Sequence, residues 1–183
     1  RMLNENINHP ENVADSYDQS EILKLQQRSK MRCLGCAAKV GNSILSRALT
    51  RVKENYPDLF SSNEILVGMN EPDDASVFSI PAGKHFVQSI DYFPALIKDP
   101  YVFAQIAVNH GFSDIYAMGA KPHSAMALAL VPFAADKIME EDLFQMLSGV
   151  AHYLSSIEAN FIGGHSAEGA ALALGVVCNG GID

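Results

Sequence analysis

The stretch MRCLGCAAKVG (31–41) places two cysteines three residues apart and a lysine three residues after the second. A Cys-x-x-Cys pair is typical of thiol redox centres, which sit at a strand-to-helix junction, and of half a zinc site, which needs four ligands. Neither context surrounds Cys33 and Cys36. A third interpretation joins Cys36 to Lys39 just before a helix start, where the cation and backbone N–H groups would lower the pKa of the thiol. A fourth is two incidental loop cysteines, so the residues alone leave the role open.

Acidic side chains form a second candidate group. Asp73 and Asp74 lie side by side in a loop expected between two strands, and Asp91 ends the strand in QSIDYF. Asp114 lies on an otherwise apolar helix face, one turn after His110. Carboxylates on loops and strand ends suit Mg²⁺, which completes its coordination with water and phosphate. Any one of these residues alone could equally be a helix cap or a turn residue.

A glycine pair gives a third feature, because NFIGGHS reads as a short strand that enters a glycine turn. Gly163 and Gly164 let a backbone approach a phosphate closely, and His165 and Ser166 add possible donors. Glycine pairs are common in turns, so this signal is weak by itself.

The elements that must position these residues alternate between helix and strand. Apolar residues at spacings of three and four predict helices, whereas short apolar runs bounded by turn residues predict strands. The expected helices cover 40–55, 100–118 and a segment capped by Asp136, and the expected strands cover 63–69, 75–80, 85–90, 123–133, 160–166 and 171–182. Residues 75–80 and 85–90 are predicted to form a hairpin around Pro81, and strand 123–133 is apolar enough to be buried on both faces.

Composition sets the limits of the chain. With 183 residues, 48% of them hydrophobic, one domain plus a tail is expected: a linker or arm over 1–30 and a domain over 31–183. A net charge of −8 argues against sequence-independent nucleic-acid binding, and no apolar run approaches the roughly 18 residues of a membrane span. Three cysteines do not make a disulfide framework, so a reducing, cytoplasmic location is expected.

Four blocks occur in the order and spacing found in the selenide, water dikinase (selenophosphate synthetase) family, and they are GCAAKVG, NEPDDASVF, the run from QSIDYF to LVPF, and FIGGHSAEGAALALGVVCNGGI. The chain resembles the amino-terminal domain of that family from residue 33 to its end. The resemblance implies an α+β fold of the aminoimidazole ribonucleotide synthetase superfamily, with a mixed sheet flanked by helices that pairs into a barrel-like homodimer. The cysteine loop also looks like the version fused behind a pyridine nucleotide-disulfide (flavin-type) oxidoreductase.

The resemblance also implies roles for individual residues. Cys36 matches the catalytic cysteine or selenocysteine, and Lys39 matches the lysine that follows it. Asp74 and Asp114 match magnesium ligands, and Asp91 matches a carboxylate that faces both nucleotide and metals. Two further groups match nucleotide-contacting positions of the family. The first is Glu71, Pro72 and Asp73. The second is Gly164, His165 and Ser166, which in the family reach the nucleotide bound to the other subunit of the dimer. The implied reaction takes ATP, selenide and water to selenophosphate, AMP and phosphate, with Mg²⁺ as cofactor.

Several positions depart from the family pattern. Ala37 and Ala38 replace the usual glycine and cysteine, His110 replaces an asparagine, and Ser89-Ile90 replace two threonines. The family continues beyond this region with a second domain that supplies another aspartate, so the chain alone is expected to be inactive. Two alternatives stay open: another ATP-using kinase or synthetase of the superfamily, or a non-catalytic nucleotide-sensing or thiol-regulatory module of a fused oxidoreductase.

Overall fold

The structure is a computed structural model that describes residues 39–183, apart from residues 61, 72 and 81. The predicted arm (1–30), both cysteines of the Cys-x-x-Cys pair and Pro72 lie outside the described residues. Three short elements, one 3-10 helix and two strands, lie between the first described helix and the main sheet. In chain order the elements are α2 (Asn42–Asn55), η3 (Pro57–Phe60), β1 (Ile65–Val67), β2 (Val77–Phe78), β3 (His85–Pro94), α3 (Pro100–Ala117), β4 (Lys121–Pro132), α4 (Asp136–Ser156), β5 (Asn160–Gly169) and β6 (Ala173–Ile182).

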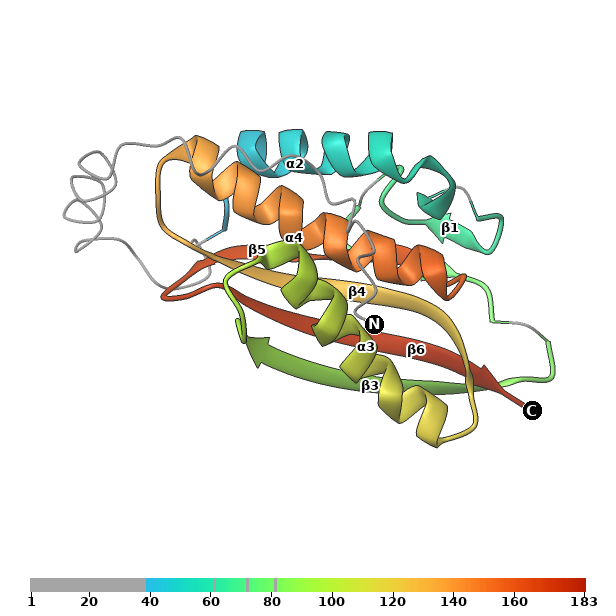
Figure 1. Ribbon diagram of the computed structural model, residues 1–183. Helices are drawn as coiled ribbons and strands as arrows, with labels where there is room; N and C mark the ends of the chain where they lie inside the picture. The colour runs from blue at the N-terminus through green and yellow to red at the C-terminus, as the bar shows by residue number, and fades with distance from the viewer. Residues whose placement is uncertain (1–38, 61, 72, 81) are drawn as a thin grey trace, which may run out of the picture.

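The main sheet has four strands in the order β3-β6-β4-β5, and it is mixed (Figure 1). β6 pairs antiparallel with both β3 and β4, while β4 and β5 are parallel and are joined by the long helix α4. A parallel pair requires a crossover of this kind, because the chain must return to the same end of the sheet. The predicted α+β class and mixed sheet are confirmed.

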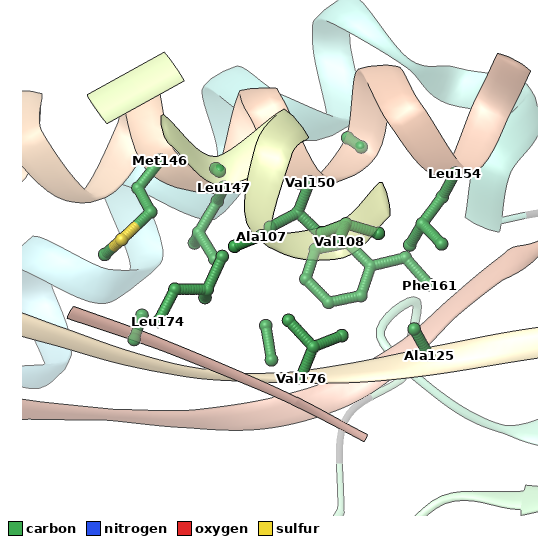
Figure 2. Close-up of a cluster of buried hydrophobic side chains, with 14 of the residues drawn as sticks. Ala107, Val108, Ala125, Met146, Leu147, Val150, Leu154, Phe161, Leu174 and Val176 are labelled. Carbon is green, nitrogen blue, oxygen red and sulfur yellow. The ribbon is translucent and has the colours of Figure 1, made fainter. Parts of the chain in front are cut away.

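Helices cover one face of this sheet in two layers. α3 and α4 pack on the strands, and α2 lies over α4 (Figure 1). Between the helices and the sheet, Leu147 and Val150 of α4 point toward Leu174 and Val176 of β6 (Figure 2), and all four are buried. Removing this apolar surface from water is the main stabilising contribution to the fold.

The opposite face of the sheet is open. Ile90 and Tyr92 on β3 are 73% and 55% exposed, and Leu128 on β4 is 39% exposed. The register brings these residues to the face away from the helices, because Tyr92 and Leu128 both pair with Gly175 while the flanking Val176 is in the core. The prediction that strand 123–133 is buried on both faces is therefore wrong within this chain.

Helix boundaries follow local capping chemistry. The carboxylate of Asp99 accepts hydrogen bonds from the backbone N–H groups of Tyr101 and Val102, 3.0 and 3.1 Å away, and so caps α3. The predicted cap of the third helix is displaced by one residue: Ala135 is the N-cap of α4, and Asp136 is its first helical residue. An acidic residue in that first turn still interacts favourably with the helix dipole.

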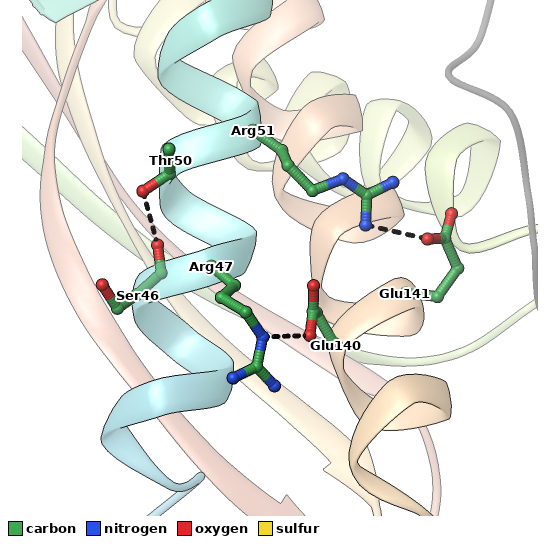
Figure 3. A network of polar contacts seen from close by, with 6 residues as sticks. All are labelled: Ser46, Arg47, Thr50, Arg51, Glu140 and Glu141. Atoms are coloured by element: carbon green, nitrogen blue, oxygen red, sulfur yellow. Dashed lines mark hydrogen bonds and ion pairs between the residues drawn. The ribbon is translucent and has the colours of Figure 1, made fainter.

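Polar contacts join α2 to α4 (Figure 3). Arg47 Nε donates to Glu140 Oε2 at 2.5 Å, and Arg51 Nη1 donates to Glu141 Oε2 at 2.9 Å. The Arg51 guanidinium also stacks over the Phe144 ring, 3.5 Å from its centroid. Glu141 is buried, so its pairing with Arg51 avoids the large cost of an isolated buried charge. These contacts fix α2 on α4, and with it the segment that contains Lys39.

Two local predictions are wrong. Residues 75–80 and 85–90 do not form a hairpin, because β2 pairs with β1 and β3 pairs with β6. The predicted face of α3 that contains Asp114 is only partly buried. Phe103 and Ala107 are in the core, whereas the other three residues predicted to share this face are exposed: Ile106, His110 and Asp114. Among the described residues, no helix combines the length and apolarity needed to cross a membrane.

Candidate functional site

A cavity of about 270 Å³ lies where the segment before α2, the β1–β2 connection and β5 meet. Its walls combine apolar side chains, such as Leu45, Met69 and Phe161, with polar groups. Seven of the residues singled out from the sequence line this cavity, and they are Lys39, Asp73, Asp74, Gly163, Gly164, His165 and Ser166. The structure therefore brings together three segments that are far apart in the chain.

Lys39 is positioned by pairing with the end of β5. It forms an isolated antiparallel bridge with Ala167, and the backbone N–H of Val40 donates to the carbonyl oxygen of Ser166 at 3.3 Å. The chain then turns directly into α2 at Asn42. Lys39 thus lies at the mouth of the cavity and just before a helix start, as predicted. Cys36 precedes it by three residues, outside the described part of the chain.

The acidic loop, defined here as the described residues 68–71 and 73–76, forms another wall. Lys53 Nζ on α2 donates to the carbonyl oxygen of Met69. Asp73 Oδ1 accepts a hydrogen bond from the backbone N–H of Asp74 at 2.8 Å. Among the residues that the structure describes, the Asp74 carboxylate has no hydrogen-bond or ion-pair partner, and it faces the cavity. Glu71 is exposed on this loop and does not line the cavity.

The glycine pair lies within a strand, so the predicted turn is wrong. β5 runs without interruption from Asn160 to Gly169, and its register with β4 shifts at Ile162, which marks a β-bulge. A Cβ atom on Gly164 would meet the carbonyl oxygen of Ala127 at 2.1 Å. Only glycine fits there, because β4 approaches the backbone too closely for any side chain.

Asp91 and Asp114 lie elsewhere, where α3 packs on β3, a place called here the β3–α3 junction. Asp91 lies inside β3 (His85–Pro94), so the prediction that it ends a strand is wrong. Asp91 Oδ2 is 3.3 Å from His110 Nδ1, and Ser89 Oγ donates to Asp114 Oδ2 at 2.7 Å. Neither carboxylate lines the cavity. Beneath them Cys178 is buried in the core. Burial raises the pKa of its thiol to about 12, and the charges of Asp91 and Asp114 act in the same direction. Cys178 is therefore a core residue and not a nucleophile.

The donor set fits a hard cation only in part. Mg²⁺ prefers oxygen ligands and is commonly held by one or two carboxylates together with water and phosphate oxygens. Asp73 and Asp74 offer such oxygens at the cavity. Within the described ranges, however, no three His, Cys, Asp or Glu side chains are grouped closely enough to hold a metal ion by themselves. The predicted convergence of Asp74, Asp91 and Asp114 on magnesium stays a prediction.

Sequence reasoning missed two polar residues of the cavity wall, Asn42 and Ser76. Asn42 begins α2, three residues after Lys39, and its position before an amphipathic helix was an available signal. Ser76 follows the Asp73-Asp74 pair within the same block of sequence. Its contact with β5 joins residues more than eighty positions apart, which no local pattern reports.

The sequence matches known proteins over most of its length. Residues 72–182 match the family described as AIR synthase related protein, N-terminal domain. A selenide, water dikinase of Nitratidesulfovibrio vulgaris (strain DP4) is 36% identical over 155 residues, which cover 85% of this chain and 43% of the relative. A selenide, water dikinase of Pelobacter propionicus is 37% identical over 146 residues, which cover 80% and 40%. The chain thus spans less than half the length of these curated relatives.

Solved structures share the fold at lower identity. The thiamine-monophosphate kinase from Stenotrophomonas maltophilia K279a matches with a TM-score of 0.59 and 20% identity, over 74% of this chain and 42% of that one. The hydrogenase maturation protein HypE in complex with ATP matches with a TM-score of 0.53 and 14% identity, over 74% and 40%. At these identities the similarity extends to the fold alone.

Proposed function

This chain belongs to the family of AIR synthase related proteins, and we propose that it is the ATP-binding amino-terminal domain of a selenide, water dikinase. The observation that carries the proposal is the cavity, in which Lys39, Asp74 and the Gly164 strand meet. The names of the relatives at 36% and 37% identity support selenide as the acceptor. The ATP-bound structure of a protein with the same fold supports ATP as the substrate.

The proposed reaction takes ATP, selenide and water to selenophosphate, AMP and phosphate. The Lys39 ammonium at the cavity mouth would interact with phosphate oxygens and offset their negative charge. Cys36, three residues before it, would handle the selenium atom. Asp74, together with Asp91 and Asp114, would hold Mg²⁺, and Asp73, Glu71 and Pro72 would contact the nucleotide. When bound, Mg²⁺ would neutralise charge on the phosphates and orient them.

A homodimer is part of this proposal. The exposed side chains of Ile90, Tyr92 and Leu128 give the open sheet face an apolar character that a second copy would bury. In such a barrel-like dimer, Gly164, His165 and Ser166 would serve the nucleotide of the neighbouring subunit. Light scattering at micromolar protein should give the mass of a dimer, and Ile90→Arg should shift it to a monomer. A monomeric wild type would contradict this part.

The experiment that tests the function uses the full-length protein, because the relatives extend well beyond this chain. Incubation with ATP, Mg²⁺ and selenide under reducing conditions should give AMP, phosphate and a selenophosphate signal in ³¹P NMR, all dependent on selenide. Formation of ADP would point to another kinase of the superfamily. ATP binding without turnover would point to a nucleotide-sensing module. We also propose an upstream oxidoreductase domain, which the full gene sequence would test. A cytoplasmic location is a further proposal, and cell fractionation would test it.

A further inference from the structure

We propose that Ser76 is a positioning residue, which locks the acidic loop onto the bulge of β5 and so holds Asp73 and Asp74 at the cavity. That the ligand at this cavity is a magnesium nucleotide rests on the proposed function. The lock itself rests only on contacts between described residues.

The first contact is a hydrogen bond at the bulge. Ser76 Oγ donates to the carbonyl oxygen of Ile162 at 2.5 Å. Ile162 has no paired residue on β4, since Ala125 pairs with Phe161 and the next residue, Met126, pairs with Gly163. It is also 1% exposed. A buried carbonyl without a partner costs free energy, so the Ser76 hydroxyl satisfies a group that the bulge leaves available.

The second contact explains the glycine that follows. A Cβ atom on Gly163 would lie 2.7 Å from Ser76 Oγ, which is closer than real Cβ contacts. The missing side chain of Gly163 is thus the space that the Ser76 hydroxyl occupies. Gly164 has a different reason to be glycine, because its Cβ would meet the backbone of Ala127 at 2.1 Å. The two adjacent glycines therefore lack a side chain for different reasons. The reason at Gly163 can be tested by changing Ser76, the side chain that it contacts.

The other end of the acidic loop is tethered separately. Lys53 on α2 donates to the carbonyl oxygen of Met69, and Asn70 Nδ2 donates to the carbonyl oxygen of Phe60 at 2.5 Å. Ser76 supplies the tether on the far side, two residues from Asp74. Both acidic residues thus lie between anchored ends, and release of Ser76 would free the segment that presents their carboxylates.

The test compares Ser76→Ala and Ser76→Gly with two glycine variants of the 183-residue chain, Gly163→Ala and the control Gly164→Ala, each made in the wild-type and in the Ser76→Gly background. The thermal unfolding midpoint measures the contact between residues 76 and 163. Overpacking by one methyl group at Gly163 should lower the midpoint by about 5 °C in the wild-type background. In the Ser76→Gly background, which has already lost the hydrogen bond to Ile162, the same change should cost less than about 2 °C more, because the colliding atom is absent. Gly164→Ala should lower the midpoint by at least about 5 °C in either background, since the collision there is with backbone.

The second readout is Mg²⁺-dependent affinity for a non-hydrolysable ATP analogue. Ser76→Ala should weaken it roughly 10-fold, at the lower end of the range expected when a residue that orients metal ligands is removed. Ser76→Gly/Gly163→Ala should be as weak as Ser76→Ala, although Gly163→Ala costs little stability in that background. A purely structural role predicts instead that affinity follows the thermal midpoint across all variants.

The outcomes separate the two proposals. If Gly163→Ala costs as much in the Ser76→Gly background as in the wild type, the lock is wrong whatever the chain binds. If that cost falls but Ser76→Ala leaves affinity unchanged, the positioning role is wrong. If the wild type binds no ATP analogue at all, the proposed function fails for this chain, while the thermal measurements still decide whether the lock exists.

Discussion

The acidic residues at the cavity and those at the β3–α3 junction differ in what their oxygen atoms already contact. Asp74 faces the cavity, and its carboxylate has no partner among the residues that the structure describes. Asp114 accepts a hydrogen bond from Ser89, and Asp91 lies against His110. A carboxylate without an internal partner has all its oxygen lone pairs available to a ligand, whereas one that accepts a hydrogen bond keeps only the others. Asp74 at the cavity therefore offers freer oxygen atoms to an ionic ligand than Asp91 and Asp114 do.

The largest effect is expected from the Cys-x-x-Cys pair that precedes Lys39 in the sequence. In the full-length protein, Cys36→Ser should lower selenide-dependent AMP formation by more than about 10³-fold, because it removes the proposed nucleophile, three residues before Lys39 in the sequence. Cys33→Ser should leave turnover within about 3-fold of wild type. Equal losses in both variants, with a reversible Cys33–Cys36 disulfide, would favour a redox pair and break the assignment of Cys36 to the cavity.

A second experiment asks whether the junction belongs to the same site. Asp114→Asn should weaken Mg²⁺-dependent nucleotide binding by about 10- to 100-fold, as expected for loss of a metal ligand or its close support. Asp73→Asn should have less than about a 3-fold effect, since Asp73 Oδ1 already accepts from the Asp74 N–H and an amide oxygen can replace it. Calorimetric titration measures both. Equal effects, or none, would leave these aspartates as turn and cap residues.

Asp142 on α4 provides a comparison, because its carboxylate is largely buried but belongs neither to the cavity nor to the β3–α3 junction. Burial raises its pKa to about 6, and the charge of Glu141 adds to the shift. A raised folded-state pKa means that the protonated form stabilises the fold below about pH 4, and that this contribution is lost as the pH rises through 6. Asp142→Asn should therefore raise the free energy of unfolding at pH 7.5 by about 1–2 kcal/mol, with little change at pH 4.

Thermal melts of wild type and Asp142→Asn at the two pH values measure that difference. Asp183 is the matched control, because the Lys84 ammonium lowers its pKa. The sign is then opposite, so Asp183→Asn should not stabilise the protein at pH 7.5. A stabilisation by Asp142→Asn of equal size at both pH values would show that ionisation is not its cause.

The smallest effect concerns thiol reactivity. Near neutral pH, Cys36 should be alkylated faster than Cys33, and Lys39→Ala should slow its alkylation about 3-fold by removing a nearby cation. Cys178 should not react in the folded protein, because it is buried and its pKa is raised to about 12. Mass spectrometry of the labelled peptides measures all three rates. Equal rates at Cys33 and Cys36 would remove the distinction between them.

Local patterns predicted the helices well, because each has an apolar stripe and an identifiable start. The predicted helix over 100–118 is observed over Pro100–Ala117, where Asp99 provides the cap. The hairpin prediction failed because turn residues report only nearby pairing. The partner of β3 is β6, and His85 pairs with Ile182. Nothing in a short stretch of sequence encodes a pairing over that separation.

The site was less accessible to sequence reasoning from residues alone. Charge and spacing identified Lys39 and the Asp73-Asp74 pair as chemical groups, but only the family resemblance placed them together before the fold did. The glycines were interpreted as a place for phosphate. Their contacts with Ser76 and Ala127 give each an internal reason to lack a side chain, and such contacts arise only when β5 packs beside other segments.

The position of β6 in the sheet affects how this domain comes into being on the ribosome. β6 is the partner of both β3 and β4, yet it comes after the other three strands of this sheet in chain order. Until residues 173–182 have left the exit tunnel, β3 has no partner in the sheet, and one edge of β4 is unpaired. Such late, long-range closure makes folding slow and leaves strand edges open to association with other chains. Nascent chains of this protein are therefore expected to depend on chaperones that shield those edges during synthesis.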